Sequence, residues 1–136
     1  MKKEFSLGWK RSKQRRKQRK YLANAPLHIR RKLMSSNLSK ELRKKYGRRS
    51  FPLRKNDVVK IMRGKFAGKT GKVNEVDLKR LRVSIEGIQN QKKEGTKVNV
   101  FFHASKLQII ELNLEDKKRQ EQLKAGKGEE NASEKK

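Results

Sequence analysis

Apolar and polar residues alternate in the middle of the chain, and this alternation predicts short β-strands. The segments concerned are residues 59–61, 73–76, 81–85, 98–102 and 107–112. In residues 73–76 the alternation has an irregular step, which predicts a β-bulge. Five short strands within 56–114 leave no room for crossover helices, so a parallel α/β architecture is excluded. The pattern predicts a mainly β fold, a small curled sheet or barrel.

A short helix is predicted just before these strands. Apolar residues recur every four positions from Leu38 to Tyr46, which places them on one side of a helix. Ser39 or Asn37 can cap its start, and Gly47 can close its end in a left-handed conformation.

The ends of the chain are polar. Residues 10–20 contain no apolar residue, so no face of a helix drawn through them could dock on a protein core. Residues 24–34 carry a weak apolar stripe, and Pro26 suits the first turn of a helix there. After residue 114 the pattern suits a short helix, and residues 124–136 form a low-complexity tail.

The net charge of +26 on 136 residues is unevenly distributed. Residues 1–55 carry +19, residues 56–114 carry +6, and residues 115–136 carry +1. We therefore expect three parts: a basic, partly helical N-terminal extension (1–50), a folded β module (51–114), and a short helical or disordered polar tail (115–136). Charge of this size is normally tolerated beside a polyanion, which implies nucleic acid. A membrane surface is excluded because the most basic segment has no apolar face.

Composition also limits the chemistry. Cysteine is absent, which removes disulfides, cysteine zinc sites and thiol catalysis, and two histidines cannot form a metal site by themselves. We expect no cofactor, no metal, no small-molecule substrate and no enzymatic activity. His103 and Ser105 could suggest a base and a nucleophile, but no carboxylate or Gly-x-Ser-x-Gly context supports them. No apolar run is long enough to span a membrane, so we expect a cytoplasmic protein.

A glycine-rich segment from Gly64 to Thr70 ends in Gly-Lys-Thr and invites comparison with a nucleotide-binding phosphate loop. That loop needs four residues between its first glycine and the Gly-Lys pair, and here there are three. A strand follows the segment in place of the helix that would hold the phosphates. Nucleotide hydrolysis is therefore excluded as an interpretation.

The same segment, from Asp57 to Val73, is similar to the KOW motif of ribosomal and transcription-elongation proteins. The resemblance implies an SH3-like barrel. Gly64 and Gly68 would permit a tight turn with positive φ, and Gly71 would let the strand bend or another backbone approach.

The flanking sequences narrow the resemblance. Residues 25–32, 38–47 and 49–54 resemble the N-terminal extension of one ribosomal family, and residues 103–107 resemble the segment before its last strand. This family is the archaeal and eukaryotic branch of large-subunit ribosomal protein twenty-four, called protein twenty-six in eukaryotes. Asn37 and Ala104 stand where that family suggests proline.

The resemblance implies a structural protein of the large ribosomal subunit that acts early in assembly. It also implies a place at the 5′ region of the large ribosomal RNA, near the peptide exit tunnel. The expected partners are that RNA and neighbouring ribosomal proteins, without homo-oligomerisation. Two alternatives stay open: a KOW-type transcription-elongation factor and a histone-like nucleic-acid-compacting protein.

The candidate RNA-binding residues are mostly cations of the arm, of the helical region and of the glycine loop, since such groups contact phosphates. They are Arg11, Arg15, Arg16, Arg19, Lys20, His28, Arg30, Arg31, Arg43, Lys44, Arg48, Arg49, Arg63, Lys65, Lys69, Lys72, His103, Ser105 and Lys106. Phe51 and Phe66 could stack on bases or pack locally.

Overall fold

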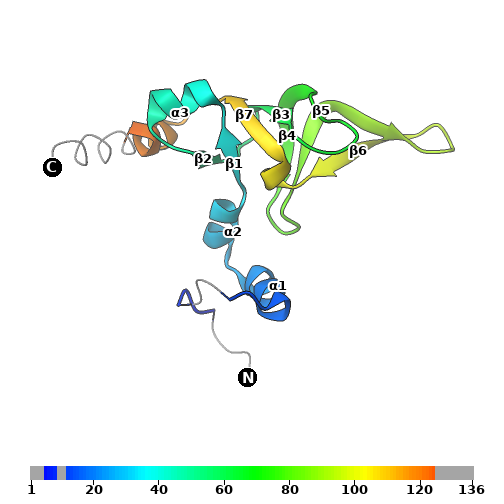
Figure 1. The fold of residues 1–136 in the computed structure, drawn as a ribbon. Helices are drawn as coiled ribbons and strands as arrows, with labels where there is room; N and C mark the ends of the chain where they lie inside the picture. Colours follow the sequence, from blue (N-terminus) through cyan, green and yellow to red (C-terminus); the bar gives the residue numbers. More distant parts are fainter. Residues whose placement is uncertain (1–4, 9–11, 125–136) are drawn as a thin grey trace.

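A computed structural model describes residues 5–8 and 12–124 of the chain, and its fold is shown in Figure 1. Strands and helices are both present, and strands predominate. The strands are β1 (Ser35–Leu38), β2 (Ser50–Pro52), β3 (Val58–Ile61), β4 (Thr70–Asp77), β5 (Arg82–Gln91), β6 (Lys97–Phe102) and β7 (Leu107–Glu111). The helices are α1 (Arg15–Asn24), α2 (Leu27–Leu33), α3 (Lys40–Tyr46) and the 3-10 turn η1 (Ala104–Lys106). Residues 117–124 are also helical.

The seven strands form one sheet in the order β2-β1-β7-β3-β4-β5-β6. Neighbouring strands are antiparallel, except that β1 runs parallel to β7. Strands β2 and β6 lie at its two ends, so hydrogen bonds do not close the sheet into a barrel. The predicted mainly β fold with helical parts is therefore confirmed, and the sheet is open.

Strand β4 joins the two halves of this sheet. Its first residues pair with β3, and residues from Val73 to Asp77 pair with β5. The register shifts between Val73 and Glu75, which confirms the predicted bulge. A second shift in the β5–β6 pairing lies between Ser84 and Gln89, and beyond it the β5–β6 hairpin extends away from the rest of the sheet. Bulges increase local bending, so they allow the two halves to enclose a core.

The prediction placed Leu81 in a strand, and this is wrong. Leu81 has a φ of 54° and lies in the turn before β5. Asp77 organises this turn, because its Oδ1 accepts hydrogen bonds from the backbone N–H groups of Lys79 (2.9 Å) and Arg80 (3.1 Å). The apolar alternation therefore starts one position too early, at a residue that the turn holds in a left-handed conformation.

Strands β1 and β2 were not predicted. Leu38, expected on the apolar face of a helix, ends β1 and pairs with Ile109 of β7. The residues of β1, Ser-Ser-Asn-Leu, have little intrinsic strand preference, and this strand forms because β7 offers it backbone partners. Its buried Ser36 hydroxyl donates to the Ala104 carbonyl, which ties β1 to the turn before β7.

The caps of α3 are confirmed. The Ser39 side chain accepts a hydrogen bond from the Leu42 N–H, and Gly47 closes the helix with a φ of 62°. Helix α2 begins at Leu27, and Pro26 precedes it in an extended conformation instead of lying in its first turn. Helix α1 has no buried residue and stands apart from the sheet in Figure 1.

One core is built from both halves of the sheet and from the flanks. It includes Val59, Val73, Val83, Phe102 and Ile109 of the strands. Met34 and Leu38, on the N-terminal side of residue 50, and Leu123, on the C-terminal side of residue 114, are also fully buried in it. The expected extension and tail therefore contribute to the same core as residues 51–114.

Candidate nucleic-acid interface

The glycine loop, residues 62–69, connects β3 to β4. Gly64 and Gly68 have φ values of 95° and 87°, conformations that favour glycine. The Gly68 N–H donates to the Ile61 carbonyl and the Ile61 N–H donates to the Lys69 carbonyl, which closes the loop at its base. The tight turn expected from these glycines is present.

Gly71 meets a different requirement. It lies in β4, and a Cβ at this position would stand 2.6 Å from Cγ2 of Ile85 and 3.0 Å from the Glu86 carbonyl oxygen. Strand β5 therefore approaches β4 closely here, which is the second role expected for a glycine in this motif.

The three cations of the loop and Lys72 of β4 are exposed. Arg63, Lys65, Lys69 and Lys72 form no ion pair within the described part of the chain. The ammonium groups of Lys65 and Lys69 lie 6.0 and 5.4 Å from the centroid of the Phe66 ring. Phe66 itself packs edge-on against the Phe102 ring, with centroids 6.2 Å apart. Of the two interpretations of Phe66, local packing is the one present in this structure.

The segment from His103 to Lys106 lies beside this loop, because the Met62 N–H donates to the Lys106 carbonyl at 2.8 Å. The Ser105 backbone N–H donates to Nδ1 of His103 at 3.2 Å. In the neutral ring the proton therefore lies on Nε2. All three candidate residues of the segment are exposed, so Nε2 of His103 is a donor available to an RNA oxygen.

The arm residues Arg15, Arg16, Arg19 and Lys20 are exposed on α1. Arg11 lies outside the described residues. Tyr21 of this helix contacts the ring of Phe5, with centroids 4.9 Å apart.

The two neighbouring arginines of α2 differ in their surroundings. Arg30 donates hydrogen bonds to the carbonyls of Ala25 (2.9 Å), Ala23 (2.6 Å) and Lys79 (3.2 Å). Its guanidinium therefore links α1, α2 and the turn before β5. Arg31 is exposed, and its side chain has no hydrogen bond or ion pair among residues 5–8 and 12–124.

The remaining candidates surround α2 and α3. His28, Lys44 and Arg49 are exposed, and Arg48 is half-buried. Arg43 is also half-buried, and its Nε is buried without a hydrogen-bond partner in the described part of the protein.

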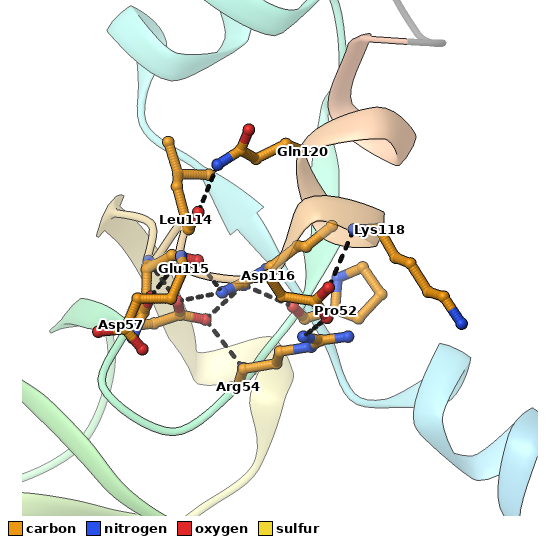
Figure 2. Close-up of polar contacts among 10 residues, drawn as sticks. Pro52, Arg54, Asp57, Leu114, Glu115, Asp116, Lys118 and Gln120 are labelled. Carbon is orange, nitrogen blue, oxygen red and sulfur yellow. Dashed lines mark hydrogen bonds and ion pairs between the residues drawn. The ribbon is translucent and has the colours of Figure 1, made fainter.

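Sequence analysis missed a buried ion pair that joins the tail to the sheet. Arg119 and Asp57 form two hydrogen bonds of 2.7 Å, with 2% and 0% of their side-chain surfaces exposed. Asp57 also accepts from the backbone N–H groups of Arg54 (2.8 Å) and Asn113 (2.9 Å). Figure 2 shows the Asp57 carboxylate at the centre of these contacts. Such a bidentate pair can be tolerated in a core, although Nε of Arg119 is buried without a hydrogen-bond partner in the described part of the protein.

Arg119 makes further contacts. It donates to the carbonyls of Asn113 (2.8 Å) and Pro52 (3.2 Å), and its guanidinium lies 5.4 Å from the centroid of the Phe51 ring. Phe51 is thus packed in the core, and the tail arginine holds β2 in place. One feature of the sequence could have indicated that Arg119 faces the core. Leu123 follows Arg119 by four residues, so the two lie on the same face of a helix.

A second ion pair lies at the surface of this cluster, between Arg54 and Asp116 (Figure 2). The hydrogen bond from the Arg54 guanidinium lowers the pKa of the Asp116 carboxyl, and backbone N–H groups from Lys118 and Arg119 lower it further. Asp116 therefore stays charged at the start of the C-terminal helix, where a negative charge is favourable.

Comparison with known proteins identifies a family. Residues 12–125 match the family model for eukaryotic ribosomal protein L26 and its archaeal counterpart, protein twenty-four. The chain belongs to this family. The resemblance drawn from the KOW motif and its flanks is thereby confirmed.

Two archaeal relatives support the assignment. The large ribosomal subunit protein uL24 of Nanoarchaeum equitans is 52% identical over 121 residues, which cover 89% of this chain and 81% of the relative. The protein of the same name from Korarchaeum cryptofilum is 51% identical over 107 residues, which cover 79% of this chain and 82% of the relative.

In the described residues, no helix is both long and apolar enough to cross a bilayer.

Proposed function

We propose that this chain is a structural, non-catalytic constituent of the large ribosomal subunit that binds large-subunit ribosomal RNA through phosphate and shape contacts. The observation that carries this proposal is the distribution of ion pairs. Within residues 5–8 and 12–124 only two ion pairs form, Arg54–Asp116 and Arg119–Asp57, and neither involves a candidate RNA-binding residue. With a net charge of +26, most cations are therefore left for an external polyanion.

The relatives of this chain indicate which polyanion it binds. Two relatives, 52% and 51% identical in sequence, are named large ribosomal subunit proteins, which favours ribosomal RNA over polymerase-bound nucleic acid or bulk DNA. In this proposal the glycine loop and the His103–Lys106 segment form one docking surface, since the Met62–Lys106 hydrogen bond places them side by side. The basic arm, including α1, extends between RNA helices.

We further propose, on the family resemblance, a place at the 5′ region of the RNA near the peptide exit tunnel, entry early in assembly, and contacts with neighbouring ribosomal proteins. Fractionation of a native lysate on a sucrose gradient tests the central claim. We expect the protein to sediment with the large subunit. Co-purification with RNA polymerase, or equal affinity for random duplex DNA and ribosomal RNA fragments, would contradict the proposal.

Salt dependence tests the mechanism. If about ten phosphates are neutralised, affinity for ribosomal RNA fragments falls about 10³ to 10⁵-fold between 50 and 200 mM salt. The double variant Lys65→Gln/Lys69→Gln should flatten the slope of log affinity against log salt by about 2, one for each lost phosphate contact. The matched control Lys117→Gln/Lys118→Gln removes the same charge from exposed tail positions. Equal effects of the two variants would show that the glycine loop is not a docking site.

A further inference from the structure

A pocket of about 760 Å³ lies between α2, β2, the turn after β4 and the C-terminal helix. Three cations line it: Arg31, Lys32 and Arg48. The side chains of these three form no hydrogen bond or ion pair in residues 5–8 and 12–124. The protein therefore gathers three uncompensated positive charges around one hollow, which favours an anionic occupant.

The rest of the lining combines two polar side chains, His28 and Gln122, with four apolar ones. Leu27, Phe51, Pro52 and Leu78 contribute to it, and 68% of the Leu27 surface is exposed. A phosphate ion could be bound by cations alone. Apolar residues beside the cations favour a ligand that has both a phosphate and an apolar face. A nucleotide has this composition, because its base offers an apolar face and polar edges.

Hydrogen bonds hold the walls of this pocket. Arg30 links α2 to the Lys79 carbonyl, next to Leu78, at 3.2 Å. Arg119 donates to the Pro52 carbonyl and lies over the Phe51 ring. Leu78 and Pro52 are thus positioned by two arginines whose guanidinium groups form hydrogen bonds within the protein. A pre-formed hollow reduces the entropic cost of ordering a ligand.

We propose that this pocket takes an unstacked nucleotide of a single-stranded RNA segment. The base packs against Leu27 and Leu78, while Arg31 and Arg48 contact the adjoining phosphates. The proposal rests on the RNA-binding function proposed above and deepens it, since it assigns a base-binding site in addition to phosphate contacts.

The proposed RNA segment can continue from this pocket into a second one. A neighbouring hollow of about 380 Å³ shares Arg31 and Leu78 with it. Its other charged lining residues are two cations, Arg54 and Lys55, and one carboxylate, Glu75. This hollow would accept the next nucleotide. The site also differs from the glycine loop, because the two lie at opposite ends of β4, whose eight residues span roughly 20 Å or more.

The first experiment compares two probes on the full chain at fixed salt: an eight-residue oligouridine and an abasic ribose-phosphate oligomer of the same length and charge. We expect the oligouridine to bind at least about fivefold more tightly, the lower end of the effect of stacking one base. Equal affinities would overturn the pocket as a base site. The phosphate contacts of the proposed function would stand, and only loss of sedimentation with the large subunit would remove those.

The second experiment locates the site. Leu27→Ala should reduce the preference for oligouridine severalfold without changing charge, whereas Leu33→Ala should leave it unchanged. Leu33 lies on the same helix with 37% of its surface exposed, and it does not line the pocket. Thermal denaturation monitored by circular dichroism checks that both variants fold.

Photocrosslinking gives a readout that does not depend on affinity. A 4-thiouridine probe on the wild-type chain should crosslink to residues 27–32 or 48–52. Crosslinks confined to residues 1–24 or to the glycine loop would overturn the assignment. The assignment would also be overturned if a peptide reduced crosslinking of the 4-thiouridine probe and unmodified oligouridine did not. That result would indicate a protein partner for this pocket.

Discussion

Removal of the Arg119 guanidinium should destabilise the whole fold, although this residue lies in the polar C-terminal region. Arg119→Ala would leave the Asp57 carboxylate, fully buried, with only the backbone N–H groups of Arg54 and Asn113 as donors. Breaking a buried ion pair by removing one partner costs about 3–5 kcal/mol. Since small domains are stable by roughly 5–15 kcal/mol, this loss is a large fraction of the total.

Chemical denaturation followed by far-UV circular dichroism at fixed salt measures this loss of free energy. In a parallel thermal scan we expect the melting temperature to fall by more than about 10 °C. The control Lys118→Ala, at an exposed neighbouring position, should change stability by no more than about 0.5 kcal/mol.

A double-mutant cycle tests the reasoning itself. In the variant that combines Asp57→Ala with Arg119→Ala, no uncompensated charge remains, so its cost should be lower than the sum of the single costs by about 0.5–3 kcal/mol. Additive single effects, or a cost of Arg119→Ala below about 1 kcal/mol, would show that the pair does not hold the tail to the sheet.

Two further predictions concern the N-terminal boundary and the glycine motif. Deletion of residues 1–24 should reduce RNA affinity and leave the melting temperature nearly unchanged, because α1 has no buried residue. Deletion of residues 1–50 should abolish cooperative melting, since it removes β1 and two core side chains. If the 1–50 deletion variant still melts cooperatively, the folded core begins after residue 50. Gly71→Ala should cost about 1–3 kcal/mol in free energy of unfolding through overpacking against Ile85. Gly8→Ala, at a terminal position, should cost less than about 0.5 kcal/mol, and equal costs for the two would contradict the packing argument.

Local pattern was sufficient for the central strands and for the caps of α3. Alternation with period two predicts strands wherever one face is buried, as in β3 and β7. The Ser39 cap and the Gly47 end of α3 depend on residues within one helical turn, so they too can be predicted from the sequence. The same holds for Gly64 and Gly68, whose turn is a property of the local backbone.

The missed features all depend on residues far apart in the chain. Strand β1 forms because it pairs with β7, about seventy positions away, and its Ser-Ser-Asn-Leu sequence carries no strand pattern of its own. Asp57 and Arg119 are 62 residues apart, and each is unremarkable in its own segment. Arg30 and Arg31 look equivalent in sequence, but tertiary contacts with Lys79 occupy the first and leave the second open.

The order of residues was enough to predict the mainly β class, the glycine turn, the family resemblance and the concentration of positive charge toward the N-terminus. Where the folded core ends, and which cations form contacts within the described residues, could be seen only in the folded chain. Strand pairing, burial of an ion pair and assembly of a pocket depend on which distant segments meet. Charge and turn geometry are carried by residues that are adjacent in the chain.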